Sequence, residues 1–336
     1  MLSLLRSRQS KVVLLLGSAI LLIVFMLMSV LFGIQTISVH TLWNAYMHFD
    51  GSYDHLVVTN TRVPRAIIAA CVGGSLAIAG ALMQALTKNP LASPSVFGIN
   101  AGASLLLVLC LSFVGPLIGQ GMMVWVAFTG AGLAACLVFL LGSFGRDGFQ
   151  PIKLTLAGSA VTAFASAITS GIMLLNKETV EEALFWLVGS VSGRELADLL
   201  MVFPYLLAGL AMAFALARAI NIMSMGDEVA KGLGQRTVMV KITAVITIVL
   251  LAGGSVAVAG PIAFIGIMVP HICRFLIGQD FRWLLPYCGV YGALLLVAAD
   301  IVSRFILMPR EVPVGVATAL LGVPFLVYIA RRRTYE

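Results

Sequence analysis

The amino-acid sequence predicts an all-α integral membrane protein with about ten transmembrane helices. Hydrophobic residues make up 60% of the 336 residues and charged residues only 10%, whereas a soluble globular domain has about 25% charged residues. The mean hydropathy is +1.06. The apolar residues also gather in runs of about 20, which is the length that a helix needs to cross a bilayer. This chain is therefore expected to fold in lipid.

Ten candidate spans follow one another along the chain, at 12–33, 64–86, 95–113, 121–142, 152–175, 195–218, 241–259, 261–277, 284–304 and 313–330. The first run is too long for the apolar part of a signal peptide and no A-x-A site follows it, so we interpret it as a span. Pro261 and Pro270 are expected to interrupt the short eighth span. No stretch resembles a soluble domain, so residues 1–336 are expected to form a single transmembrane domain.

The basic residues predict the orientation of these spans. With both termini inside, six of the 21 Lys and Arg residues face outward, namely Arg62, Arg65, Lys177, Arg194, Arg304 and Arg310. The other basic residues then face the cytoplasm, as the positive-inside rule favours. The net charge of +7 reflects this topology, and no clustered basic face of the kind that binds nucleic acid is visible.

A small-residue motif occurs twice. The sequence GGSLAIAG at 73–80 is matched by GGSVAVAG at 253–260, and in the expected topology the two helices run in opposite directions. Transporters often contain inverted repeats of this kind. A coincidence between two helices of small residues, which allow close packing, explains the match equally well.

Patterns that indicate catalysis or metal binding are absent from the sequence. There is no P-loop, no H-E-x-x-H, no G-x-S-x-G, and no C-x-x-C among the five cysteines. We therefore expect neither an enzyme nor a metal site, and no cofactor bound by this chain.

The expected inner loop at 219–240 contains a short helix. Two acidic side chains after a glycine suit a helix N-terminus, where the dipole favours anions, and apolar residues follow them on one side. Such a helix can dock into a groove on a soluble partner or can be an ordinary capped loop helix. Its residues are Gly226, Asp227, Glu228, Val229, Ala230, Leu233 and Gly234.

Charged residues mark the expected outer ends of two spans. Arg62 and Arg65 are either membrane-interface anchors or an electropositive lip for the carboxylates of an external partner. Asp300 and Arg304 have the i,i+4 spacing of a helical ion pair. A lone intramembrane Asp can instead serve a proton relay, but the nearby arginine favours structural pairing.

Seven segments in order resemble the permease subunits of ABC importers for iron–siderophores, haem and cobalamin, a family often called FecCD-like. They are RVPR at 62–65, GGSLAIAGALMQ at 73–84, NPLASPSVFGINAGA at 89–103, GDEVAKGLG at 226–234, GPIAFIGIMVPHICR at 260–274, ADIVSR at 299–304 and EVPVGVATALLGVPF at 311–325. The resemblance covers nearly the whole chain. It implies a cobalamin-permease-like fold, that of a type II ABC importer.

The resemblance also implies partners. They are a second permease subunit (the same chain or a paralogue), two ABC ATPase subunits that hold ATP and Mg²⁺, and an extracytoplasmic substrate-binding protein. By the same resemblance, 226–234 couples to the ATPase, and Arg62, Arg65 and Arg304 match positions that pair with glutamates of the binding protein. The cytoplasmic gate is implied to involve Asn89 and Leu91, and by position alone Gln150 and Pro151.

The expected function is transport of a ferric siderophore across the bacterial cytoplasmic membrane, driven by ATP that the partner hydrolyses. Haem or cobalamin is the alternative substrate. A proton-coupled secondary transporter is the alternative mechanism, with Asp300 as its one candidate ion site.

Overall fold

The computed structural model describes residues 7–33, 35–115, 119–143, 150–175, 183–184, 186–307 and 310–333; Lys177 lies outside them. Within these ranges the chain is helical, with one isolated bridge between Leu307 and Arg310. Among the described residues, seven helices are long and apolar enough to cross a membrane, and three shorter apolar helices accompany them. These segments match the predicted spans, so the expected all-helical membrane fold is confirmed.

The described helices are α1 (Arg8–Leu31), α2 (Val39–Met47), α3 (Tyr53–Val57), α4 (Val63–Thr87), α5 (Ile99–Val114), α6 (Gln120–Ser143), α7 (Pro151–Leu175), α9 (Leu196–Ser224), α10 (Asp227–Gly232), α11 (Thr237–Ile248), α12 (Gly254–Ala259), α13 (Ile265–Ile277), α14 (Phe281–Ser303) and α15 (Val314–Arg333). Two π-helical turns, η1 (Val58–Arg62) and η4 (Val249–Gly253), make α3–α4 and α11–α12 continuous, and a 3₁₀ turn, η2 (Pro94–Phe97), precedes α5.

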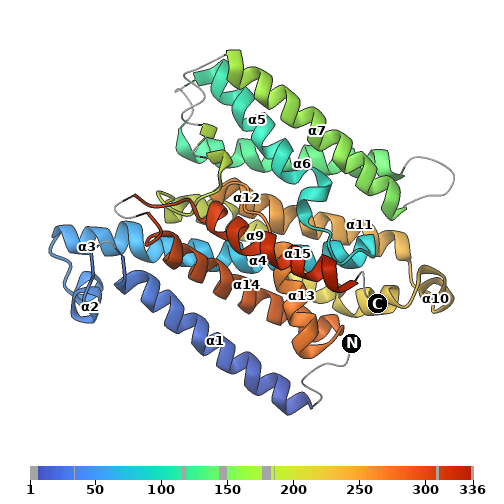
Figure 1. Cartoon of the computed structure of the whole chain (residues 1–336), viewed down its shortest axis with the longest axis horizontal. Coiled ribbons are helices and arrows are strands. Elements are labelled where there is room, and N and C mark those ends of the chain that lie inside the picture. The colour runs from blue at the N-terminus through green and yellow to red at the C-terminus, as the bar shows by residue number, and fades with distance from the viewer. Residues whose placement is uncertain are drawn as a thin grey trace.

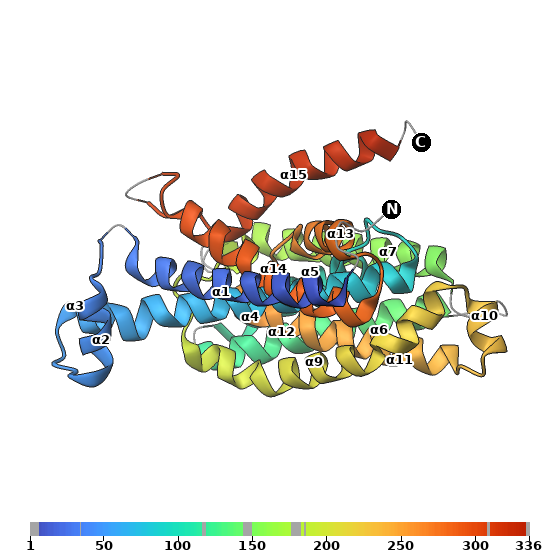
Figure 2. The ribbon, with the colours of Figure 1, turned by 90° about the horizontal axis from the view of Figure 1, so that it is seen from below.

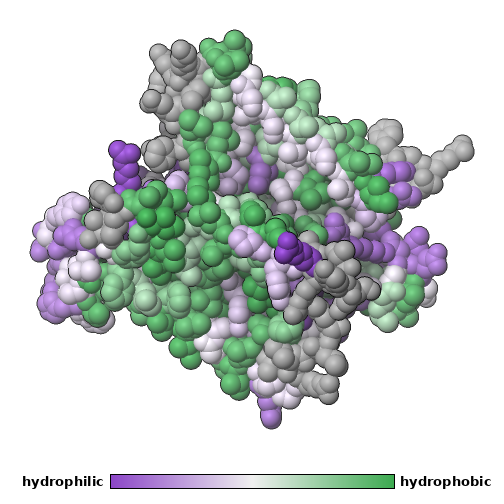
Figure 3. All heavy atoms as spheres, in the orientation of Figure 1, coloured by the Kyte–Doolittle hydropathy of each residue, from purple (hydrophilic) through white to green (hydrophobic). Residues whose placement is uncertain are grey.

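The long helices form a bundle with two distinct ends (Figure 1). Helices α2 and α3 lie at one end, and α10 lies at the other with both termini. Hydrophilic residues collect over α2 and α3 and over α10, while the surface between them is mainly hydrophobic (Figure 3). We call the α2–α3 end the outer end and the α10 end the inner end. Helix α15 leaves the body of the bundle along its C-terminal half (Figure 2).

Helix α4 lies at the centre of the bundle. In the continuous helix Tyr53–Thr87, 83% of the most apolar 18-residue stretch is buried. Its glycines allow two backbones to touch. A Cβ on Gly73 would lie 2.3 Å from the carbonyl oxygen of Gly292 in α14, and a Cβ on Gly80 would lie 2.0 Å from that of Gly266 in α13. Lipid provides no hydrophobic force between helices, so such close backbone packing is what holds them together.

Helix α1 packs loosely along its length but is fastened at both ends. Only 11% of its most apolar 18-residue stretch is buried inside the bundle. At the inner end, Lys11 Nζ donates to the carbonyl of Ile277 at 2.9 Å, and Tyr287 Oη donates to the carbonyl of Lys11 at 2.6 Å. At the outer end, Arg304 Nη1 donates to the carbonyl of Ser29 at 2.6 Å.

The interruption predicted for the eighth span is present at Pro261, which precedes α13, but the prediction was wrong at Pro270, which lies inside α13. A helical proline leaves the carbonyl four residues earlier without its usual donor. That carbonyl, on Gly266, accepts from Gln84 Nε2 of α4 at 3.1 Å. Gln84 Oε1 in turn accepts from Arg274. A buried side chain therefore replaces the lost backbone bond, and the helix continues.

The two copies of the small-residue motif occupy opposite runs of the chain. Residues 73–80 lie in α4, which runs from the outer to the inner end, and residues 253–260 follow α11, which runs back from the inner end (Figure 1). Opposite directions are what an inverted repeat requires.

Candidate functional site

A buried ion cluster occupies the outer end, centred on Asp300 of α14, whose side chain is 1% exposed. Arg65 of α4 donates from Nε to both carboxylate oxygens, at 2.9 and 3.0 Å, and from Nη2 to Oδ1 at 2.8 Å. Arg304 Nη2 donates to Oδ2 at 2.5 Å. The structure thus contains the Asp300–Arg304 pair and adds Arg65, which is 235 residues from Asp300 in the sequence.

Arg65 also reaches the surface through a second carboxylate. Its Nη1 donates to Glu311 Oε2 at 2.6 Å and to Ser192 Oγ at 3.3 Å. Partial burial raises the pKa of Glu311, but the charge and hydrogen bond of Arg65 outweigh it, so this pKa lies below its ordinary value of 4.5. Two arginines and two carboxylates therefore balance their charge within one cluster, and the Glu311 side chain is 30% exposed.

Two arginines cap the C-terminus of α1. Arg304 donates to the carbonyls of Ser29 and Phe32, at 2.6 and 3.0 Å. Arg62 donates to the carbonyls of Val30 and Gln35, at 3.3 and 2.7 Å. The last carbonyls of a helix lack intrahelical donors and carry partial negative charge, which suits guanidinium groups.

The three predicted docking arginines therefore lie together at the outer end, but none presents a bare guanidinium. Arg62 is 9% exposed, Arg65 is 5% and Arg304 is 1%. Each donates to groups of this chain, and Arg65 is also joined to Glu311, a carboxylate whose side chain is 30% exposed.

At the inner end, the predicted coupling segment forms helix α10. Gly226 precedes it with φ of 123°, a conformation that favours glycine. Ala230 is buried, whereas Val229 and Leu233 are 47% and 66% exposed, and Glu228 and Gly234 are exposed. The helix thus presents an apolar edge to solvent.

Asp227 plays a different part from its neighbours in α10. Its Oδ2 lies 2.5 Å from Lys241 Nζ and its Oδ1 lies 2.9 Å from Lys88 Nζ. Burial raises the pKa of Asp227, but the hydrogen bond from Lys241 and the positive charges of Lys241 and Lys88 outweigh it, so the pKa lies below its ordinary value. The carboxylate is directed toward this chain.

The predicted gate residues surround two helix boundaries at the inner end. Helix α4 ends at Thr87, and Lys88 follows in the left-handed region with φ of 51°. Asn89 Oδ1 then accepts from the backbone amide of Leu91 at 3.0 Å, and both residues are exposed. Pro151 begins α7, where its missing N–H costs nothing, and Gln150 lies just before it.

Helix α7 divides into three faces. The packed face contains Leu154, Gly158, Val161, Ala165 and Thr169. Exposed apolar residues such as Leu156 and Phe164 form a second face, both 66% exposed. Between them, five hydroxyl residues span about 80° of the helix, and we call them the hydroxyl face. They are Thr155, Ser159, Thr162, Ser166 and Ser170, all at least partly exposed.

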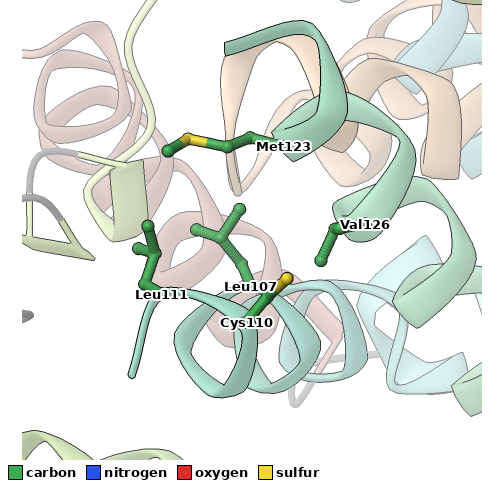
Figure 4. Close-up of a pocket in the computed structure, with 5 residues that line it drawn as sticks. All are labelled: Leu107, Cys110, Leu111, Met123 and Val126. Atoms are coloured by element: carbon green, nitrogen blue, oxygen red, sulfur yellow. The ribbon is translucent and has the colours of Figure 1, made fainter. Parts of the chain in front are cut away.

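Two hollows in the described chain are apolar. A crevice between α5 and α6 is bounded by the facing side chains of Leu107, Cys110, Leu111, Met123 and Val126 and leaves no room for a water molecule (Figure 4). A groove of about 250 Å³ on the flank runs between α1, α13 and α14. Among the described residues, no group of three His, Cys, Asp or Glu side chains is placed to hold a metal ion. Neither of these two hollows therefore forms a closed binding site for a polar substrate.

Sequence reasoning missed several partners of the predicted residues. Lys88 and Lys241 at Asp227, Glu311 at Arg65, and Gln84 at Gly266 all join positions that are far apart in the chain or in different helices. One signal was available, since an intramembrane polar residue such as Gln84 needs a buried partner.

Comparison with known proteins gives consistent matches. The FecCD transport family model matches residues 21–332. The "Probable siderophore transport system permease protein YfiZ" of Bacillus subtilis (strain 168) is 51% identical, over 90% of this chain and 91% of that protein. The "Ferric enterobactin transport system permease protein FepD" of Escherichia coli (strain K12) is 40% identical, over 95% of each.

A solved structure has the same fold. It is an inward-facing conformation of a protein assigned as a metal-chelate type ABC transporter, with a TM-score of 0.83 and 25% sequence identity, over 96% of this chain and 99% of that one.

Proposed function

Because this chain belongs to the FecCD transport family, we propose that it is the membrane-spanning subunit of an ATP-driven importer of ferric siderophores. The observation that carries the substrate class is the 51% identity to a siderophore permease over nine-tenths of the chain. Haem and cobalamin remain alternative substrates, because the described residues contain no ligand chemistry that selects among metal chelates.

The chain is a multi-pass membrane protein, and we propose that its inner end lies in the cytoplasm of a bacterium. The distribution of basic residues supports this orientation. ATP and Mg²⁺ then belong to two ATPase subunits at that end, and this chain binds no cofactor. The whole chain forms a single membrane domain, an assignment supported by one hydrophobic core that extends from α4 through α14.

The exposed edge of α10 is the proposed contact with the ATPase. Val229 and Leu233 project apolar side chains into solvent from a short helix beyond the membrane. Met225, just before the helix, is 70% exposed and extends this edge. An apolar edge on a short helix suits insertion into a groove on a soluble partner.

The outer arginine cluster is the proposed docking region for the substrate-binding protein. Docking through Arg62, Arg65 or Arg304 requires a partner carboxylate to replace an internal acceptor. Arg65 is the best placed of the three, because Glu311 holds its Nη1 from a partly exposed position. A glutamate of the binding protein can take the place of Glu311 in the same geometry.

The hydroxyl face of α7 supports a translocation path formed with a second permease subunit. Five hydroxyls on an exposed membrane face suit water or polar substrate better than acyl chains. Helix α15 also leaves the bundle and exposes Leu320, Leu321 and Val323. We infer that a second copy or a paralogue covers these faces and encloses the path.

The alternative of a proton-coupled transporter rests on Asp300. Its two oxygens receive four hydrogen bonds from Arg65 and Arg304. A carboxylate held in this way neutralises two buried guanidinium groups, which is the part of a structural ion pair.

Reconstitution tests this function. The chain is placed in proteoliposomes with a candidate ATPase and a candidate binding protein, and uptake of a ⁵⁵Fe-labelled siderophore is measured with ATP, without ATP and with a protonophore. We expect uptake that requires ATP and resists the protonophore. ATP-independent uptake that the protonophore abolishes would show a secondary transporter. If labelled haem or cobalamin were taken up in preference, that compound would replace the ferric siderophore as the proposed substrate.

A further inference from the structure

Asp227 lies where three elements of the inner end meet. It is the first residue of α10, Lys241 belongs to α11, and Lys88 caps the C-terminus of α4. One carboxylate oxygen contacts each lysine, at 2.5 Å for Lys241 and 2.9 Å for Lys88. The carboxylate therefore joins α10 to two helices at once.

The two halves of this bridge have different surroundings. The Lys241 side chain is 11% exposed and lies against the body of the bundle, whereas the Lys88 side chain is 52% exposed. The Lys241 half lies in nearly buried surroundings, where an ion pair is part of the packed structure. Loss of the Lys88 half removes a connection at the surface and leaves the fold in place.

Lys88 leads directly into the segment that reaches α7. After Lys88 the chain passes through Asn89 and Leu91 to the 3₁₀ turn η2, which packs on α7. The packing there is tight, because a Cβ on Gly158 of α7 would lie 1.7 Å from the carbonyl oxygen of Val96. A displacement at Lys88 is thus passed to the helix that carries the hydroxyl face.

We propose that Asp227 is a positioning residue whose ion pair with Lys88 transmits movement of α10 to the 88–97 segment and to α7. This inference rests on the proposed function, in which α10 receives movement from the ATPase. Helix α10 packs mainly on α9 and α11, so the Lys88 pair supplies its connection to the end of α4. Rigid contacts with discrete arrangements are what carry coupling between distant sites.

The test compares Lys88→Gln with Lys88→Arg, which keeps the charge, and with Arg282→Gln, which removes an exposed charge elsewhere at the inner end. Each variant is reconstituted with the ATPase and binding protein. The measurements are co-purification of the ATPase, ATP hydrolysis, and the number of ⁵⁵Fe–siderophore molecules transported per ATP.

We expect Lys88→Gln to keep the ATPase and its hydrolysis but to lower transport per ATP by about threefold to fivefold, the upper part of the effect that one exposed ion pair has. Lys88→Arg and Arg282→Gln should match the wild type. Combining Lys88→Gln with Asp227→Asn should lower the ratio no further than Asp227→Asn alone, because both act on one contact.

Three results would overturn the inference. Unchanged transport per ATP in Lys88→Gln would show that the ion pair transmits nothing. Loss of the ATPase from Lys88→Gln would show that Lys88 serves assembly. Absence of ATP-dependent uptake in the wild type would reject the proposed function itself, which separates that failure from a failure of the ion pair.

Discussion

Replacing Asp300 by asparagine should strongly destabilise the protein. The substitution keeps the shape of the side chain but removes the charge that neutralises two buried guanidinium groups. Arg65 and Arg304 are 5% and 1% exposed, so neither can recover solvation by turning outward. Breaking a buried pair by removing one partner costs about 3–5 kcal/mol. We expect an apparent melting temperature lower by on the order of 5–10 °C.

The assay is thermal unfolding of purified protein in detergent, with Glu311→Gln as the matched control. Glu311 contacts the same Arg65 but its side chain is 30% exposed, so its loss should cost no more than about 1 kcal/mol. Melting of Asp300→Asn within about 2 °C of wild type would refute the reasoning. Intact stability with loss of protonophore-sensitive uptake would instead assign Asp300 to proton transport.

Four further predictions concern other parts of the molecule. Gly80→Ala should lower the free energy of unfolding by about 3 kcal/mol or prevent the protein from accumulating in the membrane, because the new methyl meets a backbone carbonyl. The control Gly17→Ala, whose new methyl has no atom within 4 Å, should melt at or above the wild-type temperature. Leu233→Glu should abolish co-purification of the ATPase while leaving the melting temperature unchanged, since that side chain is 66% exposed; retention of the ATPase would reject the docking edge. Ser159→Leu together with Ser166→Leu should reduce uptake about tenfold or more by blocking a polar path, whereas Phe164→Leu on the opposite face should leave uptake unchanged. Equal uptake by the two variants would show that the hydroxyl face does not line the path. The pKa of Glu311 is lowered in the folded protein, so the stability that its carboxylate contributes is fully present above the ordinary value of 4.5 and is lost as the pH falls through the lowered value. The melting temperatures of wild type and Glu311→Gln, measured from about pH 8 to about pH 3, should therefore differ by a constant amount that disappears only at the acid end.

The order of the membrane-spanning helices could be predicted because lipid imposes a length and a composition on every span. Helix α4 shows this best: its small residues indicated close packing, and the structure places Gly73 and Gly80 against neighbouring backbones. The sequence could not identify those neighbours, Gly292 and Gly266, because tertiary pairing leaves no local periodic signal.

The candidate sites were less accessible to sequence reasoning. The spacing of Asp300 and Arg304 indicated an ion pair on one helix turn, but Arg65 enters the same cluster from another helix. Similarly, Asp227 was expected only to suit the N-terminus of a short helix, whereas the structure also directs its carboxylate to Lys88 and Lys241. Helix rules describe contacts three or four residues apart, and long-range charge pairing follows only from the assembled bundle.

The two fastenings of α1 bear on how this protein is made. Helix α1 is synthesised before the rest of the described bundle. Arg62, which caps its outer end, follows soon after, but Tyr287 and Arg304 come 276 and 275 residues after the residues that they bond. Until Tyr287 and Arg304 are made, α1 lacks these two bonds, and even in the finished bundle only 11% of its most apolar stretch is buried. An early segment of the bundle is therefore held in place by a later one, and a chain truncated before α14 should expose α1 to proteolysis or to cross-linking from lipid.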